Sequence, residues 1–141
     1  MKQRLYEDEH LLLEKLPGEQ ILVVRRKATA PSAQTIESFV PTIRKAFGGI
    51  DRTRCVMLVD LRAAPLRSGE ELDRSLLLFR AEVARDVIAL ARILATSVGK
   101  LQIRRLGGDE ERPTRSFSTE DEALTWLRAE LVRLRPGARP A

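Results

Sequence analysis

Residues 115–127 read Arg-Ser-Phe-Ser-Thr-Glu-Asp-Glu-Ala-Leu-Thr-Trp-Leu, and this stretch decides the fold class. Its first residues, around Phe117, predict a short strand. Thr119 is a typical helix cap, and the three acidic residues after it suit the positive end of a helix dipole. The helix predicted beyond them has one apolar face, formed by Ala123, Leu124, Trp126, Leu127, Leu131 and Leu134. A strand that leads directly into an amphipathic helix indicates an α/β domain.

The residues before this stretch alternate between strand and helix patterns. Residues 55–61, Cys-Val-Met-Leu-Val-Asp-Leu, are apolar without alternation, which is typical of a central strand covered on both faces. Residues 88–95 fit either a continued helix or a strand, and we choose a strand because Thr96-Ser97 looks like a fresh helix cap. The other helices are predicted at 32–47, with Pro41 kinking it or starting a new turn, at 68–87, and at 98–106.

The chain opens with a β-hairpin. Residues 11–16 and 21–26 are its strand candidates, and Pro17-Gly18 between them is a strong turn signal. Leu5-Tyr6 adds a short preceding strand. The predicted fold is therefore α/β: a mixed, mainly parallel sheet flanked by about four helices and opening with a hairpin. We expect residues 1–134 to form a single domain and residues 135–141 to be a disordered tail.

Composition narrows the class of protein. A chain of 141 residues with 43% hydrophobic content suits one domain with one core. The net charge of +5 comes from 25 basic and 20 acidic residues, and aromatic residues make up only 4%, so we expect no nucleic-acid partner. No apolar run approaches the ~20 residues of a membrane helix, and the first residues contain no signal-peptide pattern. We therefore expect a cytoplasmic protein without membrane insertion.

The residues that usually carry enzyme chemistry are sparse. His10 is the only histidine and Cys55 the only cysteine, so neither a zinc ligand set nor an intrachain disulfide can be assembled. Cys55 starts the apolar run, where it is expected to be a small core residue. There is no phosphate-loop pattern and no convincing pair of nucleophile and base. We expect no metal, no cofactor and no enzymatic activity.

Four segments together carry a resemblance to a known family: Leu16-Pro-Gly-Glu, Val56-Met-Leu-Val-Asp-Leu-Arg, Thr96-Ser-Val-Gly-Lys-Leu and residues 117–127. In this order they resemble the STAS-like (SpoIIAA-like) family of small bacterial domains, which includes anti-sigma-factor antagonists. The likeness is to its stand-alone, largely uncharacterised branch. The resemblance implies a mixed sheet packed with helices, and a regulatory function through protein–protein interaction without catalysis.

The resemblance also implies a candidate interaction site. The better-known family members carry a phosphorylatable serine, typically in Asp-Ser-Ser-Gly, at the start of the helix after the central strand. This chain has Arg67-Ser68-Gly69 there, without the preceding acid and the second serine. Ser68 is therefore either a switch residue or simply the N-cap of a capping box with Glu71 at N3. The interaction surface is expected at Arg62, Arg67, Ser68, Glu70 and Glu71.

An alternative function is the binding of a small anionic or lipid ligand. In open α/β sheets, ligands bind beyond the carboxyl ends of the strands, and a helix N-terminus there can hold an anion. The predicted crevice is lined by Asp60, Arg62, Thr96 and Ser97. The competing interpretation is an Asp60–Arg62 brace beside an ordinary helix cap. Besides an unidentified protein partner, a homodimer through an exposed helix or the hairpin edge is a further alternative.

Overall fold

The computed structural model describes residues 3–65, 69–95 and 112–134, and within them six strands form one sheet in sequential order. The first three strands pair antiparallel, whereas the pairs β3–β4, β4–β5 and β5–β6 are parallel. This confirms the predicted mixed sheet opened by a hairpin. The strands are β1 (Gln3–Glu7), β2 (Leu11–Lys15), β3 (Ile21–Arg26), β4 (Val56–Asp60), β5 (Leu90–Ile93) and β6 (Thr114–Phe117).

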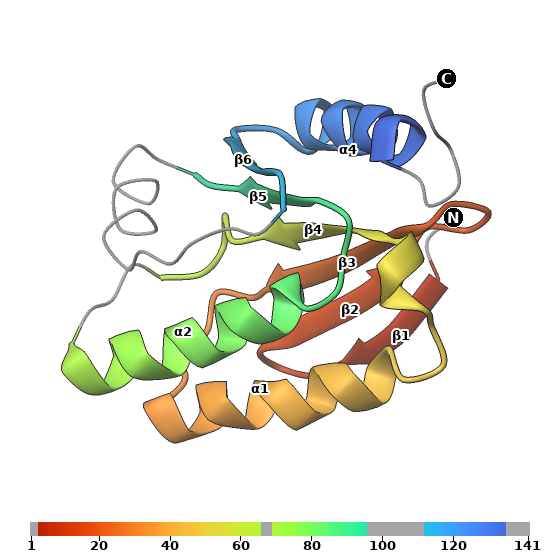
Figure 1. Ribbon diagram of the computed structural model, residues 1–141. Coiled ribbons are helices and arrows are strands. Elements are labelled where there is room, and N and C mark those ends of the chain that lie inside the picture. The colour runs from red at the N-terminus through yellow and green to blue at the C-terminus, as the bar shows by residue number, and fades with distance from the viewer. Residues whose placement is uncertain (1–2, 66–68, 96–111, 135–141) are drawn as a thin grey trace.

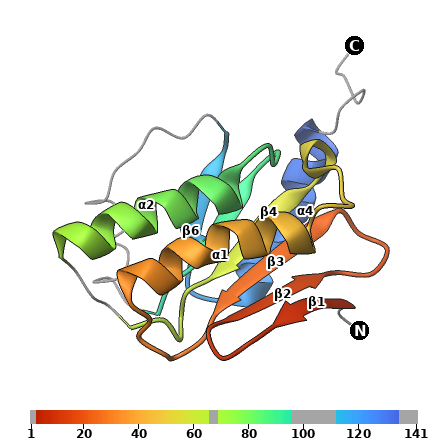
Figure 2. The same cartoon turned by 90° about the horizontal axis from the view of Figure 1, so that it is seen from below.

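Helices cover the sheet on both sides. The helices α1 (Ala33–Ala46) and α2 (Glu70–Ala84) lie side by side on one face, and α4 (Glu120–Leu134) lies on the other (Figures 1 and 2). A short 3-10 turn, η1 (Arg52–Arg54), precedes β4. The described residues thus contain three α-helices and not the four expected. The helix predicted at 98–106 lies outside the described residues, as does the predicted tail at 135–141.

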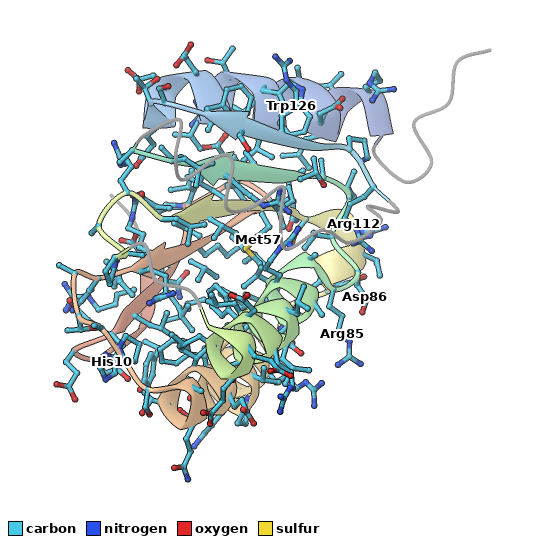
Figure 3. The ribbon with its side chains drawn as sticks, turned by 90° about the vertical axis from the view of Figure 1, so that its left-hand side faces the viewer. His10, Met57, Arg85, Asp86, Arg112 and Trp126 are labelled. Carbon is cyan, nitrogen blue, oxygen red and sulfur yellow. The ribbon has the colours of Figure 1, made fainter. Side chains whose placement is uncertain are left out.

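The core consists of two layers that alternate along the central strands. In β4, Met57 and Val59 face α1 and α2, whereas Val56 and Leu58 face α4. Figure 3 shows Met57 on the α2 side of the sheet and Trp126, in α4, on the opposite side. Every residue of β4 is buried because both faces are covered, which confirms the reading of residues 55–61 as a central strand.

Cys55 belongs to this core, as its place in an apolar run predicted. Its side chain is fully buried, and its thiol lies 3.3 Å from the side-chain oxygen of Gln20. Burial raises the pKa of the Cys55 thiol above its ordinary value. The cysteine is therefore a structural residue of the domain.

The predicted turns and strands at the chain's start are present. Gly18 has φ +74°, a conformation that favours glycine and closes the β2–β3 hairpin. Leu5 and Tyr6 lie in β1, as predicted, with a register shift between Arg4 and Tyr6. Residues 88–95 contain β5, so the choice of a strand over a continued helix is confirmed.

Two helix starts agree with the sequence and one does not. Ser32 caps α1 by accepting a hydrogen bond from the Thr35 N–H, and Thr119 accepts one from the Glu122 N–H. Pro41 lies inside the single helix α1. The N-cap of α2, however, is Gly69 and not Ser68, and it makes no side-chain cap bond.

The capping box predicted for Ser68 and Glu71 is therefore wrong. With Gly69 at N-cap, Glu71 is the second helical residue and not the third. Gly69 has φ +145°, which L side chains rarely adopt, so the chain enters this helix through its glycine. The far end differs too, because α2 ends at Ala84 and Asp86 turns the chain with φ +66° before the buried Val87.

Replacing a side chain of the central strand tests this packing. Leu58→Ala should lower the free energy of unfolding by about 3 kcal/mol, because it leaves a cavity in a fully buried site. The matched control is Val132→Ala in α4, whose residue is 69% exposed and which should change stability by less than about 0.5 kcal/mol. Urea denaturation followed by circular dichroism measures both, and equal losses would contradict the two-sided burial of β4.

Candidate functional site

A cluster of charged side chains lies where β3 and β4 end, on the α4 side of the sheet. Arg25 and Asp60 are direct partners in the parallel ladder. They follow Val23 and Leu58, which face α4, at the two-residue spacing that keeps side chains on one face. Glu120, at the first turn of α4, meets them there. We call Glu14, Arg25, Asp60, Arg62 and Glu120 the Arg25 cluster.

One guanidinium group holds the cluster together. Arg25 Nε lies 3.0 Å from Glu14 Oε1, and Arg25 Nη1 lies 2.7 Å from Asp60 Oδ2 and 2.8 Å from Glu120 Oε1. The Arg25 side chain is only 16% exposed. It therefore joins carboxylates from β2, β4 and α4 at a site with little solvent screening.

Arg62 adds a second guanidinium group to the same carboxylates. Its Nε and Nη2 donate to the two oxygens of Asp60 at 3.0 and 2.8 Å, a bidentate pair. Its Nη2 is also 3.7 Å from Glu120 Oε1. The expected Asp60–Arg62 contact is thus present, and it has the form of a brace across the loop after β4.

These contacts favour the charged forms of Asp60 and Arg25. Burial alone would raise the pKa of the Asp60 carboxyl, but hydrogen bonds from Arg62 and Arg25 hold that pKa below its ordinary value. Burial would likewise lower the pKa of Arg25, yet Glu120 and Glu14 keep it above its usual range. Three carboxylates therefore face two guanidinium groups. That balance disfavours an additional anion at this place.

The sequence predicted only part of this cluster. It named Asp60 and Arg62, which are in contact, but missed Arg25, Glu14 and Glu120. The signal available was the arginine at position 25, directly after four apolar residues of the strand, although its partner follows only from the register of β3 against β4. Of the other predicted residues, Glu70 and Glu71 are exposed at the start of α2. Arg67, Ser68, Thr96 and Ser97 lie outside the described residues.

The helix α2 presents a continuous surface away from the core. Successive helical residues are about 100° apart, so its exposed residues fall within one arc of about 120°. Two leucines halfway along the helix, near opposite edges of this arc, are unusually open: Leu77 is 42% and Leu78 is 49% exposed. We call this surface the outer face of α2, and it consists of Glu70, Glu71, Arg74, Leu77, Leu78, Ala81 and the following Arg85.

The opposite side of α2 is anchored firmly. Phe79 and Val83 are buried in the core shared with α1. Glu82, with a side chain 2% exposed, accepts hydrogen bonds from Arg44 in α1 and Arg52 in η1 at 2.9 and 3.0 Å. A buried carboxylate is costly unless it is paired, so these arginines fix the helix in place. The outer face is thus displayed on a rigid element.

A hollow lies at the other end of the sheet. It measures about 530 Å³ and lies between the β2–β3 turn, η1 and α4. Arg128 of α4 and Glu19 of the turn form a bidentate pair beside it, at 2.8 and 3.0 Å. The hollow is therefore at the amino ends of the parallel strands, away from Asp60 and Arg62.

His10 contacts Thr29, a residue distant from it in the sequence. Its Nδ1 lies 2.6 Å from the Thr29 hydroxyl oxygen, which ties the start of β2 to the loop before α1. Within the described ranges, no three His, Cys, Asp or Glu side chains gather as a metal ligand set. No helix of that same part of the chain has the length and apolarity to cross a bilayer.

Comparisons with known proteins identify the class of fold. No family model matches the chain, and a search of curated proteins found no match. Among solved structures, the chain is similar to an uncharacterised protein of the DUF3478 family with a SpoIIAA-like fold from Shewanella loihica PV-4. The TM-score is 0.62 at 17% sequence identity, covering 86% of this chain and 98% of that one. This confirms the STAS-like, SpoIIAA-like fold that the resemblance implied.

Removing the central cation of the Arg25 cluster tests its role. Arg25→Met should lower the free energy of unfolding by about 3 kcal/mol at pH 7, because three carboxylates then lose their shared partner. The exposed Arg74→Met is the control and should change stability by less than about 0.5 kcal/mol.

The same pair of variants gives a pH dependence. The folded-state pKa of Asp60 is lowered, so its stabilisation is present above the unfolded pKa of about 3.9 and is lost as the pH falls through the folded pKa. The deficit of Arg25→Met should therefore shrink between pH 7 and about pH 3, measured by urea denaturation. A deficit that stays constant over this range would show that packing, and not charge, is what Arg25 supplies.

Proposed function

We propose that this protein is a non-enzymatic interaction module that binds another protein through the outer face of α2. The observation that carries the proposal is the pair of exposed leucines, Leu77 and Leu78, halfway along that face. Open aliphatic side chains flanked by charges are suited to form the buried centre and polar rim of a protein interface.

The rigidity of α2 supports this role. Because Phe79, Val83 and Glu82 hold the other side of the helix, little ordering is required when a partner docks. The acidic start of the helix, Glu70 and Glu71, would set the orientation of the partner through charge complementarity. Of the predicted interaction residues, Glu70 and Glu71 thus form the amino-terminal end of a longer surface, whereas Arg62 belongs to the Arg25 cluster.

A regulatory, anti-sigma-antagonist-like switch is the finer form of the proposal. Ser68 precedes the outer face by two residues in the chain. The N-cap of α2 is the following residue, Gly69. A phosphate on Ser68 would add up to about two negative charges beside Glu70 and Glu71, changing the potential that a partner meets. The resemblance implies a bacterial protein, and we propose that the switch acts in the cytoplasm, as expected from the apolar patterns of the sequence.

The alternative, a small anionic or lipid ligand near Asp60 and Arg62, stays a prediction. The charge balance of the Arg25 cluster does not favour an anion, because Asp60 already occupies the Arg62 guanidinium. A non-covalently bound small molecule in native mass spectra, lost in Arg62→Ala, would revive it.

Substitution on the outer face tests the interaction proposal. Leu77→Arg places a charge at the centre of the surface and should abolish partner capture, because a buried unpaired charge opposes docking. Val132→Arg is the matched control, an equally non-conservative change at an exposed apolar residue of α4. Tagged wild type and both variants are used as baits in one lysate, with quantitative mass spectrometry.

The expected result is a stoichiometric protein held by wild type and Val132→Arg and lost from Leu77→Arg. Thermal unfolding of the purified variants checks that both remain folded. A partner retained equally by all three baits would place the binding surface elsewhere, and no stoichiometric partner for wild type would contradict the proposed function.

A further inference from the structure

We propose that a second copy of this chain docks on the outer face of α2, with the two helices antiparallel about a two-fold axis. This inference goes beyond the proposed function but uses the same surface. Self-association would then cover the leucines until a protein partner displaces the second copy, which makes partner binding dependent on the monomer.

The order of charges along the outer face carries the proposal. Glu70 and Glu71 stand at its start, Leu77 and Leu78 at its middle, and Arg85 just after its end. The Arg85 side chain is 54% exposed, and its Nε lies 3.8 Å from a carboxylate oxygen of the neighbouring Asp86. Arg74 also lies on this face, between the acidic start and the leucines. In an antiparallel pair the acidic start meets Arg85 and Arg74 meets the uncharged Ala81, so the surface is complementary to its own reverse.

A two-fold axis between Leu77 and Leu78 gives a specific pairing. Leu77 then lies opposite the partner's Leu78, and Glu70 lies opposite the partner's Arg85. Symmetry repeats each contact, so two ion pairs flank a centre of four leucines. A parallel arrangement would instead place Glu70 against the partner's Glu70, and like charges would repel.

The hairpin edge, the other predicted route to a dimer, is less suited. The register shift between Arg4 and Tyr6 interrupts the regular edge of β1. Charges also line it, since Glu7 pairs with Arg4 at 3.1 Å and with Lys27 at 2.7 Å. Irregular and charged edges resist strand addition, so β1 opposes edge-to-edge pairing.

The helix pair alone is a small interface. Stable complexes bury roughly 1,200–2,000 Å² in total, which is more than two short helices supply. We therefore expect a dissociation constant between about 1 µM and about 1 mM, a range in which monomer and dimer exchange readily.

A charge-swap experiment on the purified full chain tests the pairing. Sedimentation equilibrium of wild type should show concentration-dependent dimers. Glu70→Arg and Arg85→Glu should each weaken self-association at least about tenfold, because each variant creates two like-charge contacts. Mixing the two variants should restore dimers, since the arginines of one chain then face the glutamates of the other. The double variant, Glu70→Arg with Arg85→Glu, should also self-associate.

Each result bears on the proposal separately from the proposed function. Wild type that stays monomeric up to about 1 mM would overturn it, whatever the lysate experiment captures. The antiparallel register would be overturned if either single variant dimerised as strongly as wild type. It would also be overturned if mixing the two variants did not restore dimers. Val132→Arg should dimerise like wild type, and circular dichroism melting confirms that the variants are folded.

Discussion

The covering of both faces of β3 and β4 is the constraint on which the remaining structure depends. Two adjacent strands whose apolar side chains point alternately to opposite sides need a layer on each side. The helices α1 and α2 supply one layer and α4 the other (Figure 1). The second layer forms when the chain turns back from the edge strand β6 and crosses the sheet as α4. This path brings Glu120, at the start of α4, to the end of β4. The charged cluster there is a consequence of how the core is closed.

Most of the fold follows from patterns that are local in the sequence. The unbroken apolar run at 55–61, the Pro17-Gly18 turn and the cap at Thr119 each specify one element without reference to the rest. The start of α2 was misplaced because Ser68 and Glu71 match a capping box, yet Gly69 supplies the backbone conformation that admits the helix. The end of α2 was also misplaced, since apolar periodicity continues to Val87 although the helix stops before Asp86. Val87 is buried although it lies outside the helix, and its position in the sequence happens to continue the helical spacing of apolar residues.

The candidate site was less accessible to sequence reasoning. Asp60 and Arg62 are neighbours in the chain, and their pairing could be anticipated. The contact between Arg25 and Asp60 depends on strand register, and that with Glu120 on the path of α4. The leucines of α2 were hidden for the opposite reason, because residues 76–79 are all apolar and only the orientation of the helix decides which of them face solvent. The tertiary structure therefore determines both which charged residues meet in the Arg25 cluster and which leucines of α2 are exposed.

The buried Cys55 is a natural probe of how often the core layer around it opens. The thiolate is the form that reacts with alkylating reagents, and a fully buried thiol with a raised pKa supplies little of it. Since Cys55 is the only cysteine in the chain, any labelling of the native protein must pass through an opening of the layer beneath α1 and α2. The rate of modification therefore measures how often that half of the molecule opens, without an engineered probe.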